Sequence, residues 1–327
     1  MQSLLVDVPD LHQELSQLLR LIPPGRVSTY GKLARALGDA GAARWVGEAL
    51  VDHPHDETCC CHRVVRVDGD VGLYISRDSQ EKIDRLKREG VIVENGRVRL
   101  AEGFFDDFDS PAPLAALRQL QENLHPSVEP LKHVPTTVAG VDVSYVSPHE
   151  AVAGYVLLDL ATLEQLWSTT VVCPVRFPYI TGYLSFRELP MYAALFEKVR
   201  EADRIADVLF VDGNGILHPR RAGSASCVGI ISGVPTIGVG KKLLLGQVDL
   251  HDIPSAAPRE IVHKGEVLGY AMTAGKSNRP FFVSPGHLTS LDDSKQLTQQ
   301  VLGKTRLPLP IMLADRLSRD IAKEQKS

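Results

Sequence analysis

Hydrophobic positions near the start of the chain recur at helical spacing. Leucine and isoleucine repeat in this way between residues 11 and 22, and Pro23-Pro24-Gly25 ends the pattern, which predicts a first helix. A second short helix is predicted after Ser28 or Thr29, because either hydroxyl can cap it, and a third over 42–51. Two short helices joined by a glycine-bearing turn are typical of a helix-turn-helix, whose second helix enters a DNA groove.

The pattern changes twice before the middle of the chain. Asn95-Gly96 lies between the apolar runs VIVE and RVRL and predicts a two-residue hairpin. The stretch AEGFFDDFDSPAP, which begins at residue 101, is acidic, contains proline and has neither helical nor strand period. We therefore expect a linker over 105–113, between an N-terminal domain over 1–104 and a C-terminal domain over 114–327.

The second half of the chain alternates β-rich and helical runs. VAGVDVSYV, AVAGYVLLDL and EQLWSTTVVCPV predict three strands with short turns, a helix is predicted from Glu188 to Ala202, and the apolar run 208–211 predicts a strand that ends at Asp212. Three antiparallel strands, a helix and a returning strand indicate a ribonuclease H-like α/β domain with a mixed sheet. The predicted fold class is therefore multidomain: a small, mostly α winged helix-turn-helix domain followed by this α/β domain.

Carboxylates stand in two of the predicted strands. Asp212 ends its strand and is followed at once by Gly213, and Asp142 lies inside an otherwise apolar strand. An aspartate within a strand is costly unless it is paired or binds metal. A satisfied turn or an edge position is the alternative for Asp142. In the predicted architecture both carboxylates reach the same end of the sheet, where they would form a metal site.

Composition adds little to this picture. The 327 residues are 44% hydrophobic and 23% charged, and the formal net charge of −4 does not indicate nucleic-acid binding by overall charge. We find neither a secretory leader nor an apolar run long enough to span a bilayer. Five cysteines, three of them consecutive, make a poor disulfide framework. We therefore expect a cytoplasmic protein that does not bind membranes and is monomeric.

The consecutive cysteines precede a histidine, in the run Cys59-Cys60-Cys61-His62. An imidazole beside a thiol can deprotonate it, and the thiolate is the nucleophile. A buried structural cysteine is one alternative. A zinc site is another, because His53, His55 and His62 lie near the three cysteines, although no second spaced pair of cysteines exists.

The sequence around Cys61 resembles the DNA-binding domain of the O6-alkylguanine-DNA alkyltransferases. VSTYGKLARAL, AARWVGEAL and CHRVVRVDGDVGLY carry the resemblance, which covers residues 10–100 and lacks that family's usual N-terminal domain. It implies that Cys61 accepts the alkyl group, that His62 acts as its base through a water, and that Glu89 orients His62. It also implies that O6-alkylguanine is flipped out of the duplex, because its O6 atom is inaccessible while the base is stacked.

The same resemblance assigns DNA contacts. Arg44 would fill the space left by the flipped nucleotide, Tyr30 would press on its phosphate, and Tyr74 with the turn from Gly69 to Gly72 would line the base pocket. Two positions depart from the family, which has Pro at Cys60 and Asn at His53, in the loop that carries the acceptor. Alkyltransferase-like proteins share this domain without the acceptor cysteine, so lesion sensing without transfer is the alternative.

The second half resembles endonuclease V, the deoxyinosine-directed nuclease, from about residue 114 to 323. AGVDVSY, FPYITGYLSFRELP, VDGNGILHPRRAG, PTIGVGKKLL and FVSPGHLTSLDDS carry the resemblance, in the family's order. It implies a Mg²⁺-dependent hydrolase, with Mn²⁺ as a substitute, whose metal ligands are Asp142, Asp212 and Glu188. Lys241 would neutralise developing charge, His287 would position the attacking water, and His218 would bind phosphate.

The resemblance also implies how the damaged base is recognised. Pro178-Tyr179-Ile180 and Thr181 correspond to the wedge that fills the gap left by the extruded base, and the family has a second Pro at Thr181. Gly213 and Gly215 would let the backbone approach hypoxanthine. The expected reaction is a nick at the second phosphodiester 3′ to deoxyinosine. The expected partners are DNA carrying deoxyinosine or O6-alkylguanine, with inosine-containing RNA as the alternative substrate of the nuclease.

Overall fold

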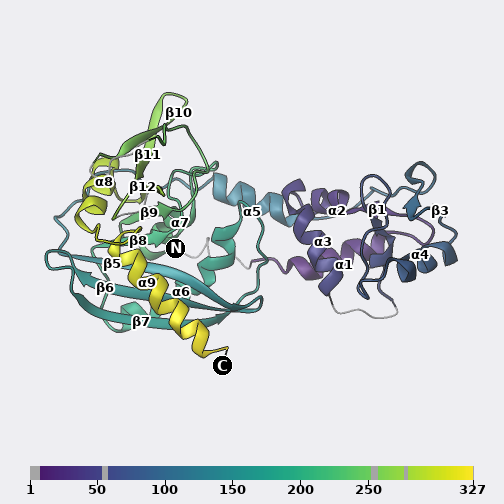
Figure 1. Cartoon of the computed structure of the whole chain (residues 1–327), viewed down its shortest axis with the longest axis horizontal. Coiled ribbons are helices and arrows are strands. Elements are labelled where there is room, and N and C mark those ends of the chain that lie inside the picture. The colour runs from purple at the N-terminus through teal and green to yellow at the C-terminus, as the bar shows by residue number, and fades with distance from the viewer. Residues whose placement is uncertain (1–7, 54–57, 252–256, 276–278, 327) are drawn as a thin grey trace. The chain divides into compact units, whose positions relative to one another are not determined.

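The computed structural model describes residues 8–53, 58–251, 257–275 and 279–326 (Figure 1). The chain divides into two compact units. The first comprises the described part of 7–119 together with 177–183, and the second comprises the described parts of 120–176 and 184–327. No helix among the described residues is long and apolar enough to cross a membrane.

The first unit is mostly helical. Its helices and short strands are α1 (Leu11–Leu21), β1 (Ser28–Thr29), α2 (Tyr30–Ala36), η1 (Ala40–Ala42), α3 (Ala43–Asp52), η2 (Cys61–Arg63), β2 (Val64–Val65), α4 (Ser79–Arg88), β3 (Val93–Glu94), β4 (Arg97–Val98) and η3 (Leu100–Glu102). The 3-10 turn η1 separates α2 from α3, as in the predicted helix-turn-helix. Thr29 caps α2 by accepting a hydrogen bond from the Lys32 amide at 3.3 Å.

The predicted hairpin joins β3 and β4. Asn95 and Gly96 both have positive φ, 51° and 74°, as a two-residue hairpin turn of this kind requires. Residues 105–113, predicted as a linker, are partly docked on the first unit. The Phe105 amide donates to the Val27 carbonyl at 2.8 Å, and Lys32 pairs with Asp106 at 2.5 Å. The helix α5 (Pro113–Glu122) follows.

The second unit is built on one mixed sheet of eight strands in the order β10-β11-β12-β9-β8-β5-β6-β7. The strands are β5 (Thr137–Ser147), β6 (Glu150–Asp159), β7 (Gln165–Pro174), β8 (Val208–Asp212), β9 (Thr236–Gly240), β10 (Arg259–His263), β11 (Glu266–Met272) and β12 (Phe281–His287). β8 runs parallel to both β5 and β9, and the remaining pairs are antiparallel. The predicted fold class is therefore confirmed.

Helices cover both faces of this sheet. α6 (Leu184–Glu201) and α7 (Ser224–Ser232) share one core with the alternate strand residues, and α9 (Leu309–Glu324) lies across β5 and β6 in the other core, near α8 (Leu291–Gln300) (Figure 1). Gly140 permits this close packing of α9, because a Cβ there would lie 1.9 Å from the Pro310 carbonyl oxygen. The sequence placed the start of α6 at Glu188, one turn too late, since Pro190 suits a first helical turn but here lies inside the helix.

The register of the parallel pair fixes the site. Val138 lies opposite Val208, and Val141 lies opposite Val211. Asp142 and Asp212 are therefore the next residues along two neighbouring strands that run in the same direction. Both carboxylates therefore lie at the same end of this parallel strand pair, as the sequence predicted.

Candidate active sites

Asp142 and Asp212 form the centre of the first candidate site. The Asp142 side chain is 6% exposed, and burial, the negative charge of Asp212 and a hydrogen bond with Asp212 raise its pKa well above the usual range. Two carboxylates this close repel each other unless a proton or a cation lies between them. The pair is therefore suited to a divalent ion, for which carboxylate oxygens are good ligands.

Glu188 joins the pair from helix α6. It is buried, and burial together with the charge of Asp212 raises its pKa to about 8. The Tyr145 hydroxyl donates to it at 3.3 Å, and the Arg187 guanidinium lies 4.6 Å from the centre of the Tyr145 ring. The one-turn extension of α6 beyond its predicted start places Glu188 within the helix, where its side chain accepts the hydrogen bond from Tyr145 of β5.

Lys241 completes this group at the end of β9. Its ammonium pairs with Asp212, and this contact raises the lysine pKa although burial opposes the shift. The sequence thus predicted four residues that the structure brings together: Asp142, Glu188, Asp212 and Lys241. The carboxylate oxygens of Asp142, Glu188 and Asp212 do not all lie within 4.8 Å of one another. Among the described residues, only the ligand atoms of His53, Cys59 and Cys61 do so.

The two histidines predicted for this site have local partners. His218 is buried, its Nδ1 accepts from the Arg220 amide at 3.2 Å, and burial lowers its pKa to about 4, so it is neutral at pH 7. His287 ends β12, and its Nδ1 accepts from the Ser127 amide at 3.1 Å. In this structure both rings are held by backbone groups, which fixes their orientation but shows no contact with the carboxylates.

The two glycines after Asp212 have packing roles of their own. The Gly213 amide donates to the Val239 carbonyl at 3.1 Å, in an isolated bridge just after β8. A Cβ at Gly215 would lie 1.9 Å from the Pro285 carbonyl oxygen, so only glycine fits where the loop after β8 packs on β12. Close backbone packing is therefore sufficient to explain Gly215, apart from any contact with a base.

Sequence reasoning missed two residues of helix α9. Ser318 donates to Asp142 at 3.3 Å, and the charge of Asp315 contributes to the raised pKa of Asp142. Asp315 also pairs with Arg319 on the same helix at 2.5 Å. No local signal marks these residues, because they lie more than 170 positions from Asp142 and reach it only through the packing of α9 on the sheet.

A second candidate site surrounds Cys61 in the first unit. His62 is buried, and its Nε2 donates to Glu89 at 2.8 Å, which leaves Nδ1 as the acceptor nitrogen. Arg63 binds the same carboxylate with two nitrogens at 2.7 and 2.9 Å. Although burial opposes the shift, the hydrogen bonds from Arg63 and His62 lower the pKa of Glu89 to about 2. Burial in turn lowers the pKa of His62, so its ring is neutral at pH 7.

Cys61 itself lies at the first residue of η2 and is 3% exposed. A hydrogen bond with Cys59, then burial, raises the pKa of its thiol, while a hydrogen bond with Tyr74 and the charge of Lys82 act in the opposite direction. Lys82 is a residue that sequence reasoning missed. It is 1% exposed, donates to the Val64 and Val71 carbonyls at 2.6 Å each, and burial lowers its pKa to about 8.

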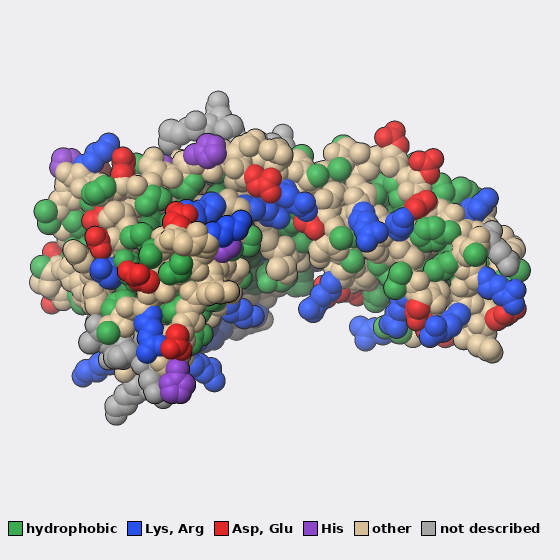
Figure 2. Space-filling model, turned by 90° about the horizontal axis from the view of Figure 1, so that it is seen from above, with side chains coloured by type: hydrophobic (Ala, Val, Ile, Leu, Met, Phe, Trp, Pro, Cys, Tyr) green, Lys and Arg blue, Asp and Glu red, His purple; other side chains and the backbone are tan. Residues whose placement is uncertain are grey.

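A cleft of about 500 Å³ opens beside α3 in the first unit. Tyr30, Arg44, Arg66 and Arg77 contribute to its lining. Arg44 is exposed and pairs with Glu48 one turn later at 2.9 Å. On the face drawn in Figure 2, lysine and arginine side chains are interspersed with acidic ones, and the cleft lining likewise combines three arginines with Glu48 and Asp52.

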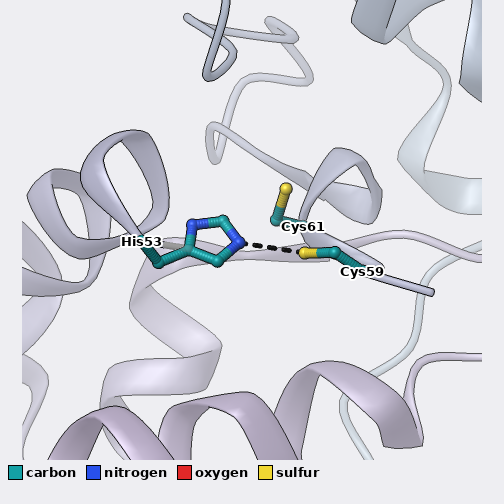
Figure 3. A group of neighbouring side chains, drawn as sticks. All are labelled: His53, Cys59 and Cys61. Atoms are coloured by element: carbon teal, nitrogen blue, oxygen red, sulfur yellow. Dashed lines mark hydrogen bonds between the residues drawn. The ribbon is translucent and has the colours of Figure 1, made fainter. Parts of the chain in front are cut away.

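The structure brings together some of the residues of the alternative zinc site. His53, Cys59 and Cys61 lie together, with His53 Nε2 2.9 Å from the Cys59 sulfur (Figure 3). His62 is not part of this group, because its ring is turned to Glu89. His55 lies outside the described residues.

The predicted wedge packs with the first unit. Phe177 and Ile180 are each 2% exposed and Pro178 is buried, whereas Tyr179 is 64% exposed and Thr181 is also exposed. The Tyr183 hydroxyl donates to Asp39 at 2.6 Å. Two of the four predicted wedge residues, Pro178 and Ile180, are therefore buried, and Tyr179 presents an exposed aromatic ring.

Comparisons with known proteins place these sites in context. The profile of Endonuclease V matches residues 118–316, and that of the 6-O-methylguanine DNA methyltransferase DNA-binding domain matches residues 10–91. A bifunctional methyltransferase/endonuclease of Picrophilus torridus is 35% identical over 93% of this chain and 94% of its own. Both halves of the chain, in this order, therefore have a counterpart in a single relative.

Solved structures agree for the second half. The catalytic domain of human endonuclease V is 30% identical, with a TM-score of 0.61 over 66% of this chain and 98% of its own. Ciona intestinalis endonuclease V, in complex with DNA containing an inosine followed by a ribo-adenosine, is 28% identical, with a TM-score of 0.59 over 66% of this chain and 100% of its own. The chain is an enzyme that belongs to the endonuclease V family, and it carries an alkyltransferase-type DNA-binding domain ahead of the nuclease, as the bifunctional methyltransferase/endonucleases do.

Proposed function

We propose that the second unit nicks DNA at the second phosphodiester 3′ to deoxyinosine and that the reaction requires Mg²⁺. The observation that carries this proposal is that Asp142 and Asp212 lie together at one end of two parallel strands, with Glu188 and Lys241 beside them. Family membership supports DNA repair and metal dependence in general terms. The substrate and the position of the nick are the finer part of the proposal.

Asp142 and Asp212 would hold the ion directly, and Glu188 directly or through a water. The donor set fits a hard cation, because such ions prefer carboxylate oxygens. A bound cation would also offset the burial and the mutual repulsion that raise the pKa values of Asp142 and Glu188. When bound, Mg²⁺ polarises the scissile phosphate and stabilises the departing 3′ oxygen. Lys241 would exchange its bond with Asp212 for the phosphate, and Tyr179 would stack in the gap left by the base.

The test is cleavage of matched duplexes with and without a single deoxyinosine, beside an RNA of the same sequence containing inosine. We expect a Mg²⁺-dependent nick in the deoxyinosine duplex and its loss in Asp212→Asn. Faster cleavage of the RNA would assign the nuclease to inosine RNA instead. Full activity of Asp212→Asn would refute the assigned site.

We propose further that Cys61 accepts an alkyl group from O6-alkylguanine once per protein molecule. The sulfur forms a bond to the alkyl carbon as the bond from that carbon to O6 breaks, and the electron pair of that bond stays with guanine. The thiol proton would pass to Nδ1 of His62, because Nε2 is bonded to Glu89. Nδ1 is buried and has no protein partner among the described residues, so it is available for this proton.

One observation favours lesion sensing without transfer: the Cys59 contact and burial keep the Cys61 thiol protonated. Duplex DNA with one O6-methylguanine, followed by intact mass and peptide mapping, separates the two functions. We expect one added methyl on the Cys61 peptide, none in Cys61→Ser, and an unaltered result in Cys60→Ser. Binding of this DNA without any gain in mass would make the domain a sensor.

A further inference from the structure

His53, Cys59 and Cys61 are the starting point for a separate site. Their candidate ligand atoms, one nitrogen and two sulfurs, all lie within 4.8 Å of one another, and no other trio of His, Cys, Asp or Glu in the described chain does so. Figure 3 shows the His53 ring and the Cys59 sulfur directed at one another, with Cys61 beside them. From the geometry we infer that these three residues form a site for Zn²⁺ or a similar soft divalent ion, and that an ion bound there withholds Cys61 from alkyl transfer.

The His53 ring is already oriented as a ligand. Its Nδ1 lies 3.1 Å from the Leu50 carbonyl oxygen and must donate to it, which leaves Nε2 with its lone pair toward Cys59. Histidines that bind metal commonly donate their other ring nitrogen to a carbonyl in this way, because the bond fixes the tautomer and the ring plane. The end of α3 therefore presents a nitrogen donor to the two sulfurs.

The ligand types select the metal. Zinc is bound by cysteine sulfur at about 2.3 Å and histidine nitrogen at about 2.0–2.1 Å, whereas Mg²⁺ requires oxygen. In a tetrahedral site those lengths separate neighbouring ligand atoms by about 3.3–3.8 Å. The ligand atoms, all within 4.8 Å now, need only small side-chain movements to reach that geometry. Two thiolates also neutralise the ion, so no net charge is buried.

Access to the site is partial. Cys61 is buried, but His53 and Cys59 are half-buried and line a small cavity together with Ser16 and Arg20. An ion can reach the two outer ligands from solvent, and the fourth position remains for water. Binding releases the two thiol protons, and the Cys61 sulfur then holds the metal with the electron pair that would otherwise attack the alkyl carbon.

Cys60 provides a matched control from the same loop. Its thiol donates to the Thr58 carbonyl at 3.4 Å and accepts from Arg63 at 3.2 Å, so its sulfur is engaged outside the trio. His53→Asn restores the residue that alkyltransferases have there, which makes it a variant compatible with the domain. Cys59→Ser removes a ligand and changes one atom.

The test titrates Co²⁺ into the reduced, metal-free full-length protein and follows the thiolate-to-cobalt absorption, which the carboxylates of the nuclease site cannot produce. We expect tetrahedral thiolate-to-cobalt bands whose amplitude corresponds to one thiolate-bound Co²⁺ per chain, apart from any Co²⁺ at the nuclease carboxylates, and which Zn²⁺ abolishes. His53→Asn and Cys59→Ser should bind at least about 100-fold more weakly, and Cys60→Ser should bind like the wild type. Wild-type protein without thiolate bands, or variants of His53 and Cys59 that keep them, would overturn the site.

A second measurement tests the effect on Cys61, and this part rests on the proposed alkyl transfer. One equivalent of Zn²⁺ should block methylation of Cys61, a chelator should restore it, and His53→Asn should be insensitive to Zn²⁺. Methylation unaffected by bound Zn²⁺ would overturn the withholding of Cys61. If Cys61 never accepts a methyl group in metal-free protein, the alkyl-transfer proposal fails, while the cobalt spectra still decide whether the metal site exists.

Discussion

The most demanding prediction concerns pH and metal binding in the nuclease site. Glu188 has a pKa of about 8, and that of Asp142 is also raised, because both are buried near Asp212. A divalent ion binds the ionised carboxylates, so it must displace the protons that they carry. Lowering the pH from 8 to 6 should therefore weaken metal binding far more than it would for ordinary surface carboxylates.

The magnitude follows from the pKa of Glu188. With a pKa of about 8 this carboxyl is about nine-tenths protonated at pH 7, so an ion that binds it releases close to one proton. Each proton released changes the apparent Kd about tenfold per pH unit. Glu188 alone thus predicts about a tenfold weakening from pH 7 to 6, and Asp142, which titrates together with Asp212, adds up to another tenfold. Binding should level off above about pH 9, where Glu188 is ionised.

Free Mn²⁺ measured by electron paramagnetic resonance, without DNA, gives the apparent Kd from pH 6 to 9. Below pH 8 log Kd falls with rising pH, and Glu188→Gln should make this slope less steep by about one, while exposed Glu164→Gln should leave it unchanged. Both variants are compared at constant ionic strength. An apparent Kd that varies less than about twofold between pH 6 and 8 would refute the argument, since it would mean that the carboxylates bind the ion without losing protons.

Three further predictions concern single side chains. Glu89→Gln should slow methyl transfer by about 10²–10⁴-fold in rapid-quench assays, because the carboxylate that orients the neighbouring imidazole is lost; a rate within about threefold of Glu94→Gln, an exposed control, would contradict this. Tyr183→Phe should lower the free energy of unfolding in urea by about 1–2 kcal/mol, since its buried hydroxyl donates to Asp39 at 2.6 Å and lies 3.2 Å from the Leu114 carbonyl oxygen; an unchanged midpoint would count against it. Gly215→Ala should cost about 1–3 kcal/mol or more by calorimetry, because its Cβ would meet the Pro285 carbonyl oxygen, and a wild-type melting curve would contradict that packing.

The parts that sequence predicted well depend on local pattern. Runs rich in β-forming residues located β5 to β7, and the aspartate inside β5 was conspicuous because few polar residues interrupt such a strand. The Asn95-Gly96 hairpin required only the conformational preference of two residues. Asp142 and Asp212 could be assigned because each interrupts or ends a predicted strand, whereas Lys241 was assigned only through the resemblance to endonuclease V.

The parts that it missed depend on distant packing. Asp315 and Ser318 approach Asp142 only because α9 packs on β5, and Lys82 enters the Cys61 region from the middle of the mostly polar helix α4. His53 and Cys59 come together because α3 ends beside η2. Such contacts between elements leave no periodic signal in the chain.

The segment 177–183 limits where this chain can be cut into two separately folding parts. The chain leaves the first compact unit after residue 119, returns to it for seven residues and leaves again. A nuclease half produced from residue 120 onward would keep Phe177, Ile180 and Tyr183 but lose Asp39 and the apolar side chains that share their unit. In this chain a cut at residue 120 would therefore leave the apolar loop of 177–183 uncovered, so a nuclease half that is to stay soluble alone must keep its partners from the first unit or replace these apolar side chains.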